Sequence, residues 1–136
     1  MHIDTGNAYE LDTRGTGWFV GFSEWTRPST AGLRHIARDE PLAGLCMKWF
    51  DHPPGMRGDA KPVSEGRTLS ILVNDGGEFE IDFCESADFS GELRTVRLAR
   101  PGDFVAWGAG LYHRWRCARR ATIATLRWGP APPAAH

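Results

Sequence analysis

The chain has 136 residues, a formal net charge of −1 at pH 7 and an apolar share of 41%. This length fits one domain that buries a core of its own. A charge near zero provides no broad basic surface for nucleic acid and no attraction to an acidic membrane. We therefore expect neither nucleic acid nor a membrane as a partner.

The cysteines and the N-terminal segment predict the compartment. Cys46, Cys84 and Cys117 are odd in number, widely spaced and without a Cys-x-x-Cys pair, which favours free thiols in a reducing environment. Residues 1–15 are polar and contain no apolar run typical of a secretion signal or a membrane helix. We expect a cytoplasmic protein.

Short β-rich runs separated by Gly, Pro and Asp predict an all-β sandwich or barrel, and helical periodicity is weak. In chain order the expected strands are 18–22, 33–37, 44–50, 68–73, 78–83, 93–98, 103–107, 113–117 and 122–128. The clearest alternation is in residues 78–83, where Phe79 and Ile81 take one face and acids take the other. The Asn-Asp-Gly-Gly run at 74–77 predicts a hairpin turn before that strand.

The chain shows no internal repeat and no second domain. Residues 1–128 are expected to form a single barrel with N-terminal strands. Residues 52–66 carry three prolines and three glycines and predict a long loop, a kind of segment that is often functional. Residues 129–136 are a tail rich in Pro and Ala that we expect to fray.

The segment 101–113 is the most informative part of the sequence. It combines a tight Pro-Gly turn, a short apolar strand, a glycine-relaxed loop and a histidine that opens the next strand. Gly108 and Gly110 admit backbone angles that other residues resist. Side chains alternate along a strand, so His113 shares a face with Trp115 and enters the core if Trp115 does. His113 is therefore the first candidate for chemistry.

This segment resembles the second motif of the cupin superfamily. The two glycines and the histidine of the motif are in register at Gly102, Gly110 and His113. Gly108 stands at the proline position of the motif and Cys117 at its asparagine position. Residues 68–83 and 124–128 also resemble segments of small single-domain cupins. The resemblance implies an all-β, cupin-type double-stranded β-helix (a jelly-roll barrel) with a central pocket.

Cupins commonly hold one divalent metal with two histidines and a glutamate of their first motif and the histidine of the second. In this chain only His113 is in place. One alignment of the first motif puts Phe50 and His52 at the two histidine positions. The other alignment puts either Val63 and Glu65 or Pro62 and Ser64 there. Both leave Thr68 or Ser70 near the glutamate position, so the usual ligand set is broken.

The sequence therefore supports two interpretations of the histidines. His52 and His113, with Glu65 or His35, could assemble a non-standard site for iron, zinc, manganese, nickel or copper. The alternative is that His52 and His113 are pocket histidines with hydrogen-bond partners and no metal.

The strand that precedes the long loop presents a further candidate. Lys48 and Phe50 share a face with His52, so Lys48 enters the barrel if His52 does. A lysine in an apolar pocket could bind a carboxylate, act as a base or form a Schiff base. Alternatively, Met47 and Trp49 form the buried face and Lys48 reaches outward.

Aromatic and arginine side chains complete the expected site. We expect ligand-binding roles for Phe50, Trp107, Tyr112, Trp115 and Arg57. Arg57 and Arg67 flank the long loop and either clamp a carboxylate or phosphate or lie on the surface. A basic cluster at Arg114, Arg116, Arg119 and Arg120 is either a solvated strand edge or an attraction for an anionic ligand.

Two functions follow as hypotheses. The first is an enzyme that acts on a small polar or aromatic organic molecule, with His113 as the main acid–base group or metal ligand and His52 and Lys48 assisting. Isomerase, cyclase, lyase and oxygenase chemistry are all compatible with this fold. The second is a non-catalytic small-molecule binding or sensor domain that has lost the usual metal site. We expect a homodimer in either case, because apolar edge strands need covering.

Overall fold

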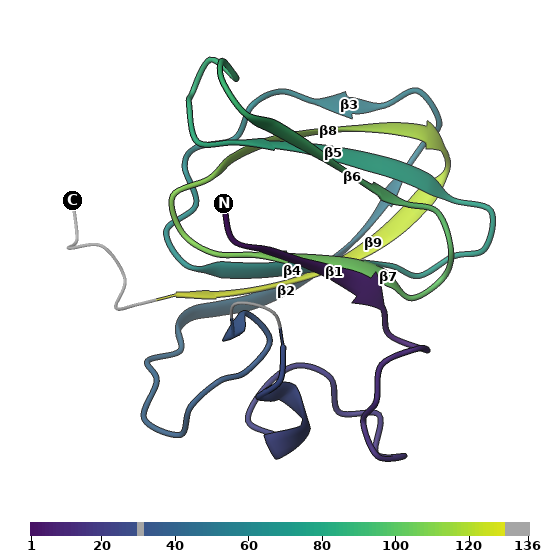
Figure 1. Ribbon diagram of the computed structural model, residues 1–136. Coiled ribbons are helices and arrows are strands. Elements are labelled where there is room, and N and C mark those ends of the chain that lie inside the picture. The colour runs from purple at the N-terminus through teal and green to yellow at the C-terminus, as the bar shows by residue number, and fades with distance from the viewer. Residues whose placement is uncertain (30–31, 130–136) are drawn as a thin grey trace.

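Two facing antiparallel sheets form the molecule (Figure 1). The computed structural model describes residues 1–29 and 32–129, so the predicted tail lies almost entirely outside the described residues. The first sheet contains β1 (Ile3–Asn7), β7 (Asp103–Trp107), β4 (Arg67–Leu72), β9 (Ala121–Gly129) and β2 (Ala43–His52), in that order. The second contains β3 (Arg57–Gly58), β8 (Tyr112–Arg119), β5 (Glu78–Cys84) and β6 (Leu93–Leu98).

Seven of the nine predicted strands are confirmed, as β2 and β4 to β9. The predictions for 18–22 and 33–37 are wrong, because both runs belong to the excursion between β1 and β2 that lies against the outer face of the first sheet (Figure 1). Leu33 and Ile36 are buried there and Phe19 and Val20 are partly buried, whereas Trp18 and Phe22 are exposed. Among the described residues of these runs the pairing is limited to one isolated bridge between Gly21 and His35. β1 and β3 carry too few apolar residues, or are too short, to have been predicted from a strand pattern.

The prediction of a hairpin at 74–77 is also wrong. β4 pairs with β7 and β9, whereas β5 pairs with β6 and β8, so the Asn-Asp-Gly-Gly turn carries the chain from one sheet to the other. The alternation predicted for β5 is confirmed, since Phe79 and Ile81 are buried between the sheets. The turn chemistry was right, but a local signal cannot tell which strand the next one will pair with.

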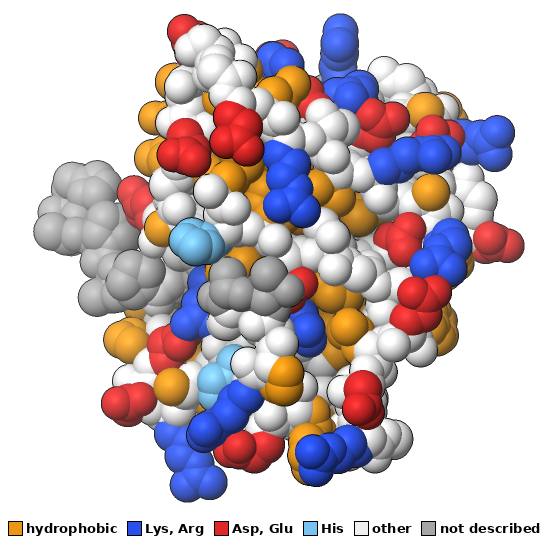
Figure 2. Space-filling model, viewed as in Figure 1, with side chains coloured by type: hydrophobic (Ala, Val, Ile, Leu, Met, Phe, Trp, Pro, Cys, Tyr) orange, Lys and Arg blue, Asp and Glu red, His pale blue; other side chains and the backbone are white. Residues whose placement is uncertain are grey.

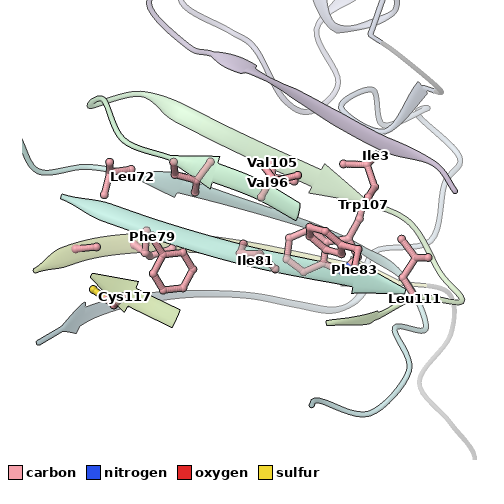
Figure 3. Packing of buried hydrophobic residues seen from close by; sticks show 13 residues of the cluster. Ile3, Leu72, Phe79, Ile81, Phe83, Val96, Val105, Trp107, Leu111 and Cys117 are labelled. Atoms are coloured by element: carbon pink, nitrogen blue, oxygen red, sulfur yellow. The ribbon is translucent and has the colours of Figure 1, made fainter. Parts of the chain in front are cut away.

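The core fills one part of the space between the sheets. Figure 3 shows its aromatic centre, where Phe83 lies against Trp107, and their ring centroids are 5.0 Å apart. A second, smaller cluster lies on the other side of the first sheet, where Leu33 and Phe19 of the excursion cover Phe104. One sheet is therefore buried on both faces over β7 and β4.

Two glycines of the 101–113 segment have conformations that favour glycine. Gly102 has a φ of 90°, and a Cβ there would lie 2.7 Å from the ring of Tyr9. Gly110 has a φ of 85° in the loop before β8. Gly108 has no positive φ, so of the two glycines expected to adopt unusual backbone angles only Gly110 does so.

The remaining features concern the thiols and the membrane. Cys46 is exposed and Cys84 and Cys117 are buried, all as free thiols. Within the described residues no helix has the length and apolar character needed to cross a membrane.

Candidate functional site

A cavity of about 720 Å³ lies between the two sheets, beside the packed core and next to edge strand β2. Its inner wall is apolar and aromatic, with Phe79, Ile81, Trp107, Trp115 and Ile123. The volume is in the range of pockets that enclose small organic molecules, roughly 300–1,000 Å³. The barrel interior is therefore only partly filled by side chains.

His113 lies on the wall of this cavity, near the start of β8. Its ring centroid is 5.1 Å from that of Trp107, and its buried Nδ1 has no hydrogen-bond partner among the described residues. Burial lowers its pKa from 6.5 to about 4, and the positive charges of Lys61 and Lys48 add to the effect. The imidazole is therefore neutral at pH 7.

His52 is the second imidazole of the cavity, at the end of β2. Its side chain is only 6% exposed, its centroid is 4.4 Å from that of Trp115, and its Nδ1 also has no partner within residues 1–29 and 32–129. Burial, followed by the charge of Lys48, lowers its pKa from 6.5 to about 4. Two neutral imidazoles therefore share one cavity.

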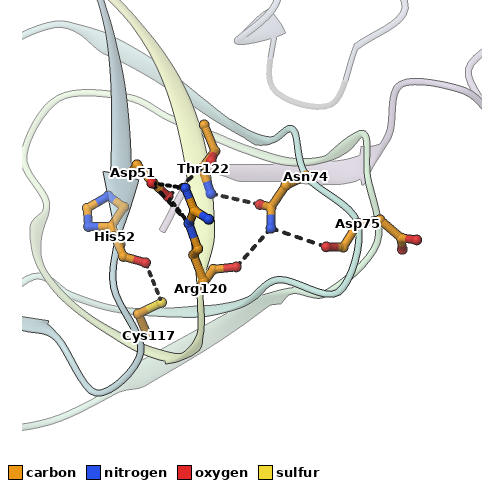
Figure 4. A network of polar contacts seen from close by, with 7 residues as sticks. All are labelled: Asp51, His52, Asn74, Asp75, Cys117, Arg120 and Thr122. Atoms are coloured by element: carbon orange, nitrogen blue, oxygen red, sulfur yellow. Dashed lines mark hydrogen bonds and ion pairs between the residues drawn. The ribbon is translucent and has the colours of Figure 1, made fainter.

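Side chains beyond the cavity hold the end of β2 in place. Figure 4 shows the ring of His52 on one side of the strand and Asp51 on the other, where Arg120 donates to both carboxylate oxygens of Asp51. The main-chain carbonyl of His52 accepts a bond from the thiol of Cys117 at 3.6 Å. These contacts fix which face of β2 enters the barrel.

Lys48 lies on the open side of the cavity wall. It lines the cavity together with His52 while remaining exposed to solvent, and Met47 and Trp49 are 66% and 63% exposed. The alternative in which Met47 and Trp49 form the buried face is therefore wrong. The described residues of the excursion between β1 and β2 leave Met47 and Trp49 exposed, whereas they cover β7 and β4.

The long loop after β2 lies along β8 and lines the cavity. Lys61 donates its main-chain N–H to the carbonyl of His113 at 2.9 Å. Ser64 exchanges main-chain bonds with Leu111 and Gly110, and its hydroxyl donates to the carbonyl of Gly108 at 2.7 Å. The loop is therefore fastened on both sides of His113, and it places Lys61 on the cavity wall.

The comparisons with known proteins concern structure rather than sequence. No sequence model of a protein family and no curated protein matches this chain significantly. A dTDP sugar isomerase from Desulfovibrio desulfuricans G20 aligns with a TM-score of 0.52 and 15% identity, over 73% of this chain and 68% of that chain. Streptomyces albus HEPD, with 2-hydroxyethylphosphonate and Fe(II) bound, aligns with a TM-score of 0.52 and 16% identity. A cupin superfamily protein from Desulfitobacterium hafniense DCB-2 gives a TM-score of 0.48 and 14% identity, over 70% of this chain and 72% of that chain.

The chain has the cupin fold. The predicted all-β jelly roll is confirmed with it. The HEPD alignment covers 65% of this chain but only 19% of that one, so the chain spans less than a fifth of the length of that enzyme. At these identities the likeness concerns the fold, and the chemistry has to be argued from the residues of the cavity.

The residues present do not fit the usual metal of a cupin. His52, His113 and Glu65 all line the cavity, but no three potential ligands come together anywhere in residues 1–29 and 32–129. Thr68 and Ser70 do lie on the cavity wall, and neither supplies a carboxylate. The charge of Lys48 also acts on both imidazoles, which disfavours a second cation between them. His35, the other proposed ligand, is bonded to Thr26 instead.

Three of the predicted ligand-binding residues are not part of the cavity wall. Tyr112 precedes His113 on β8 and so lies on the opposite face of the strand. Arg57 lines a polar hollow on the outside of the second sheet, beside Asp82 and Arg116. Phe50 contacts the ring of His52, with centroids 4.6 Å apart, without lining the cavity itself. Trp107 and Trp115 do line it, and their ligand-binding role stays a prediction.

The arginines of the basic cluster, and Arg67, form ion pairs. Arg114 and Arg116 both pair with buried Asp82, and Arg116 also pairs with Glu80 on the outer face of the second sheet. Arg119 and Arg120 pair with acids of β5 and β2, and Arg67 pairs with Glu40. Figure 2 shows charges of both signs mixed over the face that it presents. Of the two interpretations of the basic cluster, this arrangement matches a solvated strand edge rather than an attraction for an anionic ligand.

Sequence reasoning did not assign a role to Lys61, Arg127 or Ser64. Lys61 and Arg127 add positive charge to the cavity, and Ser64 holds the loop. One signal for Lys61 was available, because Lys48 and Lys61 are the only two lysines of the chain. Both belong to the same cavity.

Proposed function

We propose that this cupin is an enzyme that performs acid–base chemistry on a small organic molecule enclosed in the barrel. The observation that supports the proposal best is the pair of neutral imidazoles, His52 and His113, on the wall of one largely apolar cavity. Histidine is the usual proton-transfer group near neutral pH. An apolar wall excludes water and strengthens the interactions of the few polar groups inside.

His113 is the principal acid–base group in this proposal. A neutral imidazole can accept a proton from a bound molecule and return it to another atom. Its pKa of about 4 makes it a weak base, but a negative charge on the substrate would raise that pKa toward neutrality. Lys48, on the same wall, would stabilise negative charge that develops on the substrate.

The reaction classes that these residues support involve proton transfer. Isomerisation, cyclisation and elimination each take a proton from one atom and deliver it to another, and His113 with His52 can do both. No step through a metal is derived, because no third ligand joins the two imidazoles within the described residues. The substrate is a small molecule that fits a cavity of about 720 Å³.

One observation favours the second candidate, a binding or sensor domain without catalysis. Neither Nδ1 of the two histidines has a partner among the described residues, so no carboxylate orients either ring. Catalytic histidines are commonly oriented through that atom. Turnover therefore has to be tested separately from binding.

The test is a turnover screen with the full chain. Small polar and aromatic compounds are incubated with the wild type and with His113→Gln, and products and solvent-deuterium exchange are followed by NMR. We expect exchange or conversion of at least one compound class by the wild type, with a loss of at least about 100-fold in His113→Gln. Binding of compounds in the cavity without exchange or conversion contradicts the enzyme and supports the binding domain.

A further inference from the structure

The charges of the cavity are unevenly distributed. Lys48, Lys61 and Arg127 line it, and Glu65 is its one carboxylate among the described residues. The three cations come from β2, the loop after it and β9, three separate segments of the chain. With both imidazoles neutral, the cavity carries an excess of positive charge beside an apolar wall.

These cations are also unpaired. None of Lys48, Lys61 and Arg127 forms an ion pair in residues 1–29 and 32–129, whereas most arginines on the outside do, as Arg114, Arg116 and Arg120 illustrate. Lys48, Lys61 and Arg127 are exposed and unpaired in the described residues, so they are available to a ligand that enters the cavity. Their side chains are exposed at the open side of the cavity, so an anionic group entering between them gains charge-assisted hydrogen bonds without having to displace a partner.

A second observation points to a ligand in the same place. Every buried side-chain nitrogen or oxygen that lacks a hydrogen-bond partner in the described chain belongs to a cavity residue: His52 Nδ1, Trp107 Nε1 and His113 Nδ1. The indole N–H of Trp107 can only donate, so a bound molecule with acceptor atoms would satisfy it. Buried groups without partners are rare in folded proteins and often mark a functional site.

We propose that the natural ligand is a small organic anion, with its acidic group between Lys48 and Lys61 and its apolar body against Trp107 and Trp115. This inference rests on the proposed function and names its substrate class. Carboxylates and phosphonates share the chemistry that the site recognises. The two lysines act as point charges, which suit either group, and the aromatic wall suits a flat body.

Isothermal titration calorimetry with the full chain tests this inference. The probes are phenylacetate, benzylphosphonate and the uncharged phenylacetamide, and their Kd values are compared for the wild type and for Lys48→Met with Lys61→Met. We expect at least one anion to bind the wild type about tenfold or more tightly than the amide, and the double variant to lose that preference. The ratio of the Kd values of phenylacetate and benzylphosphonate then shows whether the site prefers a carboxylate or a phosphonate.

Two controls keep the test decisive. Arg57→Met removes a cation outside the cavity and should leave all Kd values within twofold, and Lys48→Gln with Lys61→Gln repeats the test if the methionine variant folds poorly. Equal binding of amide and anions, or an anion preference that survives loss of both lysines, overturns the inference. Anion binding without turnover contradicts the enzyme alone, so the two proposals fail separately.

Discussion

His52 and His113 illustrate how burial sets the charge of single residues in this protein. Each is surrounded by aromatic rings, and each has a pKa of about 4 instead of 6.5. Between these values the unfolded chain binds protons that the folded chain does not. Stability should therefore fall as the pH falls from 6.5 to about 4, and should not change through these groups above 6.5.

This predicts the pH dependence of urea unfolding. Near pH 5 the wild type should lose roughly 2–3 kcal/mol of unfolding free energy per pH unit, because about two protons are taken up on unfolding. His113→Gln should reduce this slope by about half. The carboxyls with lowered pKa, such as Asp82 and Asp103, affect stability only below their ordinary value of 3.8. A flat profile between pH 6.5 and 4.5 would show that both rings are solvated.

At the scale of elements, β3 packs on Trp115, and the loop after β3 forms one wall of the cavity. β3 has only two residues, and its Gly58 pairs with Trp115 on β8. A Cβ on Gly58 would lie 2.3 Å from Nε1 of Trp115, so the indole lies directly on the glycine. The short strand positions Trp115 beside His52.

Gly58→Ala should therefore displace Trp115 and destabilise the fold by about 1–3 kcal/mol, as expected for overpacking. Gly108→Ala is the matched control, because the nearest atom to its Cβ would be Leu33 Cδ2 at 3.4 Å. We expect that variant to stay within about 0.5 kcal/mol of the wild type. Urea unfolding measures both. Equal effects of the two substitutions would contradict the described packing of Trp115.

The local elements could be predicted from the sequence, whereas the site could be predicted only in part. Alternation identified β5 and the strand that carries His113, and the glycine spacing led to the cupin fold. The direction of Lys48 could not be predicted, because both faces of β2 alternate equally well. The contribution of Lys61 depends on how the loop lies along β8, and that contact joins residues far apart in the sequence.

At the scale of the whole molecule, the excursion between β1 and β2 is tied to the barrel by a buried ion pair. Arg34 of the excursion donates to Asp4 of β1 at 2.7 Å, and both residues are buried. Arg34 also donates to the carbonyl of Phe19, within the excursion. The pair therefore connects the excursion to the edge of the first sheet.

Arg34→Leu should cost about 3–5 kcal/mol, because it leaves the carboxylate of Asp4 buried without its partner. Asp4→Leu combined with Arg34→Leu should recover most of that loss, since no charge then remains buried. Unfolding free energies of the single and double variants measure the difference. A single variant as stable as the wild type would mean that Asp4 is hydrated.

The predicted homodimer also belongs to this scale. Leu45, Met47 and Trp49 project from one face of edge strand β2 and are largely exposed. Long apolar edge strands favour pairing with another chain, and a second copy offers the same edge. Light scattering should give a dimeric mass for the wild type and a monomeric mass for Met47→Lys. A monomeric wild type at micromolar concentration would contradict the expectation.

The central claim is that a small organic anion binds against His113 inside the barrel. The most direct measurement is the side-chain ¹⁵N spectrum of His113 at pH 7, recorded without and with phenylacetate. We expect a neutral imidazole in the free protein and a saturable shift of its signals on addition, absent in Lys48→Met with Lys61→Met. A charged ring in the free protein, or signals that do not respond at saturating phenylacetate, would contradict the claim.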